Sequence, residues 1–96
     1  MDTIEKLCQE LESILSGINT SGIKDIDPGV IDQINKLSGA SEELSMKTGK
    51  KLIDNLVASL QSFKEGKSDE NSVTLRITAL DFYSKKVLSG EELEDL

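Results

Sequence analysis

The sequence predicts an all-α protein, a small antiparallel four-helix bundle, and three observations support this. Apolar residues recur at the i, i+3, i+4 spacing of one helix face in four segments, separated by short segments of glycine and small polar residues. The chain has only two phenylalanines and one tyrosine, so leucine, isoleucine and valine must build its core. Ninety-six residues support one core, so we expect a single helical-bundle domain over residues 1–90 and an acidic, frayed tail at 91–96. The expected helices cover residues 2–16, 28–38, 41–65 and 69–88.

The first expected helix, residues 2–16, has the clearest periodicity. Asp2 is placed to cap its start, and Gly17 to end it. Cys8 lies within the apolar face, so we interpret it as a core cysteine rather than a nucleophile, which would need a lowered pKa and a neighbouring base. The chain contains no histidine to act as that base. The face consists of Ile4, Leu7, Cys8, Leu11, Ile14 and Leu15.

The second expected helix, residues 28–38, follows a loop that is rich in glycine and small polar residues. Asp27 and Pro28 predict its start. An N-cap carboxylate accepts hydrogen bonds from free backbone amides, and a proline at the first helical position costs no hydrogen bond, because the amide that it lacks would have no partner within the helix. Gly39 is the expected end. The inner face consists of Val30, Ile31, Ile34 and Leu37.

The third expected helix, residues 41–65, is long and ends at Gly66. Gly49 falls within it, and a glycine inside a helix costs about 1 kcal/mol relative to alanine. We therefore interpret Gly49 in one of two ways: it allows close approach of another helix, or it marks the true start of this one. The inner face consists of Met46, Gly49, Ile53, Leu56, Leu60 and Phe63.

The fourth expected helix, residues 69–88, begins with Ser68 or Asp69 as its cap and forms an antiparallel hairpin with the third. Residues 73–78 alternate between apolar and polar, which by itself is typical of a half-buried strand. No second segment alternates in this way, and a lone strand cannot pair its own backbone groups. The helical pattern also continues beyond residue 78. We therefore favour a helix, with an intermolecular strand as the alternative.

As a helix, residues 69–88 carry two apolar faces. The inner one is led by Val73, Ile77, Leu80 and Val87, and the outer one by Leu75, Ala79 and Phe82 at i, i+4, i+7, with Lys86 beside them. Two interpretations of the second face remain open. Either this helix is the most buried one, with neighbours on both faces, or the outer face is exposed and binds a partner.

The formal net charge of −7 is uneven: residues 41–88 carry +1, whereas residues 1–40 and 89–96 carry −4 each. No lysine and arginine stripe with interleaved aromatics is present, which argues against direct binding to nucleic acid or to an anionic membrane. One cysteine and the lack of a signal-like or spanning apolar run indicate a cytoplasmic protein.

The sequence also argues against catalysis. It has no histidine or tryptophan, no cluster with metal-ligand spacing and no motif that brings carboxylates together in a pocket. We therefore expect a protein that is not an enzyme and that needs no metal or other cofactor.

Two families of small helical proteins were compared with the chain. Acyl carrier proteins carry an Asp-Ser-Leu motif at the start of their second helix, but the nearest match, Glu12-Ser13-Ile14, falls inside the first expected helix. The chain is similar in length and helix order to bacteriocin immunity proteins, with no shared motif. The function we expect is a protein–protein interaction module, a homodimer or an adaptor. The alternative is an apolar-ligand carrier or an immunity-type factor. The partner-binding residues we expect are Leu75, Ala79, Phe82 and Lys86.

Overall fold

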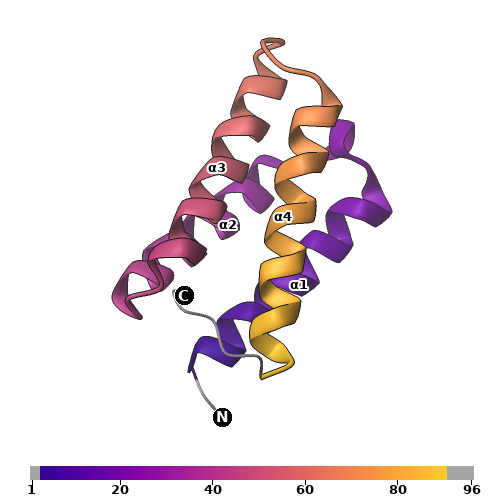
Figure 1. Cartoon of the computed structure of the whole chain (residues 1–96). Helices are drawn as coiled ribbons and strands as arrows, with labels where there is room; N and C mark the ends of the chain where they lie inside the picture. Colours follow the sequence, from indigo (N-terminus) through magenta and orange to yellow (C-terminus); the bar gives the residue numbers. More distant parts are fainter. Residues whose placement is uncertain (1–2, 91–96) are drawn as a thin grey trace.

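The computed structural model describes residues 3–90, and no strand occurs among them. The all-α prediction is therefore confirmed. Residues 73–78 are helical, so the strand alternative for that segment is wrong. The predicted cap at Asp2 and the acidic tail at 91–96 lie outside the described residues. The elements are α1 (Thr3–Ser21), a 3₁₀ turn η1 (Ile23–Asp25), α2 (Pro28–Glu43), α3 (Lys47–Lys64) and α4 (Glu70–Leu88) (Figure 1).

The four helices pack as a ring. Each helix contacts its neighbours in the sequence, and contact between α1 and α4 closes the ring. The α1–α2 contact is the least extensive of the four, and the α2–α3 contact is the most extensive. Helices α3 and α4 form an antiparallel hairpin in front of α1 and α2 (Figure 1). This arrangement is the four-helix bundle that the sequence predicts.

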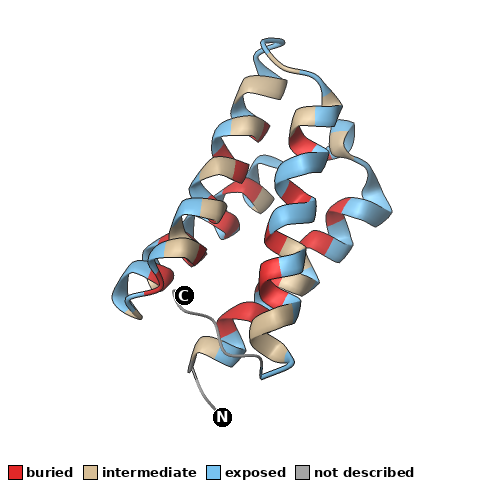
Figure 2. Cartoon of the chain, in the orientation of Figure 1, coloured by how far each residue is buried: buried red, intermediate tan, exposed pale blue. Residues whose placement is uncertain are grey.

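One hydrophobic cluster fills the inside of this ring. Each helix contributes at least one large side chain with no exposed surface, and in Figure 2 the buried positions line the inner sides of the helices. Burying a leucine or isoleucine side chain contributes about 1.5–3 kcal/mol, so these aliphatic residues supply most of the stability. The fully buried representatives of the four helices include Leu11, Ile34, Ile53 and Leu80.

Two predicted helix ends are wrong, and the reason is the same in both. Helix α1 continues through Gly17 to Ser21, and α2 continues through Gly39 to Glu43. Extending α1 buries Ile18, which is 3% exposed, and this outweighs the cost of about 1 kcal/mol for an internal glycine. Extending α2 packs half-buried Ala40 and Leu44 against the core, and the buried Ser41 hydroxyl is satisfied by donating a hydrogen bond to the Leu37 carbonyl.

The turn between α2 and α3 lies at residues 44–46, so α3 begins at Lys47 rather than at residue 41. Ser45 has φ 60°, in the left-handed region that favours glycine. The Met46 amide donates to the Ser41 carbonyl at 2.9 Å, which closes the end of α2 as a Schellman motif does. Gly66, with φ 76°, occupies the equivalent position after α3. Ser45 therefore stands where glycine is the usual residue.

The predicted N-caps of α2 and α4 are confirmed. The Asp27 carboxylate accepts a hydrogen bond from the Gly29 amide at 2.9 Å, with Pro28 at the first helical position. The Asp69 carboxylate accepts one from the Ser72 amide at 3.1 Å. Both caps satisfy backbone donors that a helix start leaves free.

Gly49 is buried in the first turn of α3, against the side chain of Tyr83 from α4. A Cβ atom placed on Gly49 would lie 2.8 Å from the Tyr83 hydroxyl oxygen and 3.2 Å from the ring carbon that carries it. The interpretation that this glycine allows a neighbouring helix to approach closely is therefore confirmed, whereas the helix itself starts two residues earlier, at Lys47.

Candidate functional site

The candidate site is the outer face of α4, defined by Leu75, Ala79, Phe82 and Lys86. Leu75 is 70% exposed and Phe82 is 62% exposed, and they are the exposed large hydrophobic residues of the described chain. Ala79, between them, is also exposed. These three side chains recur at i, i+4, i+7, so they share one side of the helix.

The position of α4 in the ring explains this exposure. Its inner residues Val73, Ile77 and Leu80 are at most 5% exposed, and it packs against α1 on one side and α3 on the other. No third helix among residues 3–90 covers its outward side, which is mostly exposed (Figure 2). The interpretation of α4 as the most buried helix, with neighbours on both faces, is therefore wrong, because Leu75 and Phe82 on its outer face are exposed.

Lys86 lies over the Phe82 ring, with its Nζ 4.7 Å from the ring centroid. A lysine ammonium at this distance is attracted by the electron-rich face of the ring, by about 0.5–1 kcal/mol at an exposed site. The contact places a positive charge at one end of the apolar patch. The four residues predicted as partner-binding thus occupy a single continuous face.

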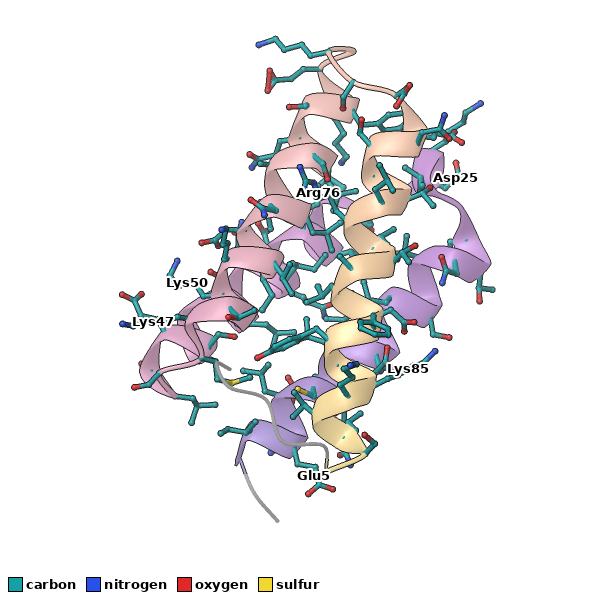
Figure 3. All side chains as sticks on the ribbon, in the orientation of Figure 1. Glu5, Asp25, Lys47, Lys50, Arg76 and Lys85 are labelled. Carbon is teal, nitrogen blue, oxygen red and sulfur yellow. The ribbon has the colours of Figure 1, made fainter. Side chains whose placement is uncertain are left out.

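Further charges flank this face on both sides (Figure 3). Arg76 is exposed and extends toward α3, where it lines a hollow of about 250 Å³ with Asn55, Ala58 and Ser62. Lys85 projects on the opposite side, toward α1, and its Nζ lies 3.0 Å from an Asp81 carboxylate oxygen. Arg76 makes no ion pair with any other described residue.

Two carboxyl groups meet between α1 and α4, an arrangement that the sequence analysis did not predict. Glu12 from α1 lies against Asp81, beside Lys85. Burial, the hydrogen bond with Asp81 and the charge of Asp81 raise the pKa of Glu12 to about 7. The hydrogen bond from Glu12 and the charge of Lys85 hold the pKa of Asp81 below its usual value. The pair therefore takes up a single proton as the pH falls through about 7, while Asp81 stays ionised.

Cys8 is fully buried in the same interface, and its identification as a core cysteine is confirmed. Burial and the negative charge of Glu12 raise the pKa of its thiol to about 11, and the nearby Ser84 hydroxyl offsets this only in part. A thiol with this pKa is protonated at neutral pH and is a poor nucleophile.

No group of three or more histidine, cysteine, aspartate or glutamate side chains within residues 3–90 is placed to hold a metal ion. Nor does the described part of the chain contain a helix with the length and hydrophobicity needed to cross a membrane.

A hollow of about 320 Å³ lies between α1 and α2, where helix contact is least extensive. Its apolar lining comes from half-buried Ile14 and Val30 and from buried Ile18 and Ile26, and Ser13 and Gln33 add polar groups. The volume is at the lower end of the range for small-molecule sites, about 300–1,000 Å³.

A signal for the Glu12–Asp81 pair exists in the sequence, but it is weak. Glu12 follows Cys8 by four residues and borders the apolar face of α1, and Asp81 has the same relation to Ile77 in α4. Periodicity places each carboxyl beside a buried face. It does not predict the axial alignment of the two helices that brings the carboxyls together.

Comparison of this chain with protein-family models, with curated proteins and with solved structures finds no match.

Proposed function

We propose that this protein is a helical protein–protein interaction module, a homodimer or an adaptor, that binds through the outer face of α4. The observation that carries the proposal is the exposure of Leu75 and Phe82 on one side of a helix whose inner residues Val73, Ile77 and Leu80 are buried. Isolated exposed apolar residues are common on protein surfaces, but a large leucine and phenylalanine one heptad apart match the spacing with which helices recognise each other.

The test replaces both large side chains, as Leu75→Asp with Phe82→Asp. Because both residues are exposed, we expect the variant to keep its helical circular dichroism and to lose less than about 1 kcal/mol of unfolding free energy. We also expect it to lose self-association, measured by light scattering, or capture of a protein from an extract of its own cells.

The matched control is Gln9→Asp with Asn35→Asp, which adds the same charge at exposed positions on α1 and α2. This control should retain association. If the α4 variant retains association as well, or if it unfolds, the outer face is not a binding surface.

A second candidate function, carriage of a small apolar ligand, is favoured by the hollow between α1 and α2. Ile14 and Ile18 of α1 line one of its sides and Ile26 and Val30 the other, at the least extensive helix contact. Native mass spectrometry of protein purified from its own host should then detect added mass, and Ile14→Asp should remove it. Detection of the bare chain alone would count against this function.

A further inference from the structure

We infer that the hollow between α1 and α2 binds an amphiphilic organic cation, a small molecule with a short alkyl body and an ammonium head. This inference rests on the second candidate function, carriage of a small ligand, and adds the charge of that ligand. It is independent of binding at the outer face of α4.

The hollow is apolar between two polar ends. It extends along α1 from Ser13 to Ser21, about 12 Å at about 1.5 Å per residue. Gly17, between these ends, has no side chain to fill the space, and a Cβ atom built on it would meet no other atom within 4 Å. A short alkyl chain that lies along this lining is removed from water, which favours binding. The apolar side chains of the lining are Ile14, Ile18, Ile26 and Val30.

The charged groups of the lining are two carboxylates, both from the segment that joins α1 to α2. The Asp25 carboxylate makes no ion pair with another described residue. The Asp27 carboxylate accepts the Gly29 amide through Oδ1, which leaves Oδ2 for a ligand. No lysine or arginine among residues 3–90 lines the hollow, and Lys24 has its Nζ 3.8 Å from a Glu70 carboxylate oxygen of α4. Negative charge is therefore concentrated at one end of the apolar lining.

A ligand that suits both parts of the hollow is an amphiphile with a positive head. Its ammonium group can pair with Asp25 and with Oδ2 of Asp27, while its alkyl chain lies between the isoleucines. A carboxylate or phosphate head would instead lie beside two like charges. The net charge of −7, of which residues 1–40 contribute −4, acts in the same direction, because it attracts a cation and repels an anion.

The test titrates the isotope-labelled full chain with three probes that share an octyl chain: octylammonium, octanol and octanoate. Chemical shifts of the backbone amides locate the site and give a Kd for each probe. We expect the shifts to concentrate at Gly17, Ile18, Ile26 and Val30. Octylammonium should bind at least about fivefold more tightly than octanol at low salt, with the difference reduced at high salt, and octanoate should bind most weakly.

Removal of the two carboxylates gives the second readout. Asp25→Asn with Asp27→Asn should weaken octylammonium binding by about fivefold and leave octanol binding unchanged, and the helix start is kept because asparagine is also a good N-cap. The matched control, Glu5→Gln with Glu43→Gln, removes the same charge from exposed positions at the opposite ends of α1 and α2. It should leave the affinity for octylammonium almost unchanged. Equal weakening by the two variants would show that only overall charge matters, which overturns the inference.

The remaining outcomes separate this inference from carriage itself. If octanol or octanoate binds in the hollow as tightly as octylammonium, carriage of a small ligand stands but the preference for a cation is wrong. If the probes shift Leu75 and Phe82 instead, the alkyl chain binds the outer face of α4 and the hollow is not a site. If no probe shifts the residues of the hollow, this inference and carriage both fail, whereas the interaction surface on α4 is unaffected.

Discussion

Three glycines inside helices provide a quantitative test of the α3–α4 packing. Gly17 in α1 and Gly39 in α2 are exposed, and a Cβ atom built on either would meet no other atom within 4 Å. Alanine at each of these positions should stabilise the protein by about 0.5–1 kcal/mol, because alanine loses less backbone entropy than glycine when the helix forms.

Gly49→Ala, in contrast, should lower the unfolding free energy. The added methyl group would lie 2.8 Å from the Tyr83 hydroxyl oxygen and 3.2–3.3 Å from two ring carbons, and Tyr83 is only 6% exposed, so its ring has little room to move. Overpacking a buried site costs about 1–3 kcal/mol. The gain in helix propensity is smaller than at mid-helix, because Gly49 lies in the first turn of α3. We expect a net loss of about 1 kcal/mol.

Urea denaturation followed by circular dichroism measures all three variants, and thermal midpoints provide a check at about 4–8 °C per kcal/mol for a domain of this size. Combining Tyr83→Phe with Gly49→Ala removes the closest contact, so it should recover part of the unfolding free energy that Gly49→Ala loses. A double-mutant cycle with both single variants isolates the coupling between the two positions. If Gly49→Ala stabilises the protein as much as Gly17→Ala does, the close packing of α3 against Tyr83 is wrong.

Two further changes test other parts of the bundle. Ser45→Gly should stabilise the protein by about 0.5–1 kcal/mol in urea denaturation, because φ 60° strains serine but not glycine; a loss of stability would contradict the left-handed turn. Since the folded pKa of Glu12 is about 7, above its ordinary 4.5, the folded state binds the extra proton, and unfolding free energy should fall by about 1 kcal/mol as pH rises from 4.5 to 7. Glu12→Gln keeps a donor to Asp81 and should flatten this decline, which denaturation at several pH values would detect; an unchanged slope would assign the decline to other groups.

The number of helices and their buried faces could be predicted from the sequence, because apolar periodicity depends on each helix alone. Helix ends were less predictable. Gly17 and Gly39 are sound stop signals in isolation, but the packing of Ile18, and of Ala40 and Leu44, against the core outweighs the small cost of an internal glycine. The free energies that compete at such positions differ by about 1 kcal/mol, and their balance depends on packing.

The candidate site was predictable only as a set of residues on one side of a helix. Leu75, Ala79 and Phe82 could be assigned to a second face from their spacing, but two interpretations of that face remained, because its exposure depends on how many helices pack against α4. The Glu12–Asp81 pair depends on the axial alignment of α1 and α4. The exposure of the outer face and the axial alignment of the two helices both depend on tertiary packing, so the periodicity of a single helix cannot predict them.

Because the protein has a single thiol, the contact between α1 and α4 that closes the helix ring can be measured without an introduced cysteine. Cys8 lies between α1 and α4, with no exposed surface, so an alkylating reagent reaches it only when these helices separate. When closing is fast relative to alkylation, the labelling rate reports the equilibrium population of that opening. An opening free energy below that of global unfolding would mean that the first and last helices part while the rest of the bundle stays folded.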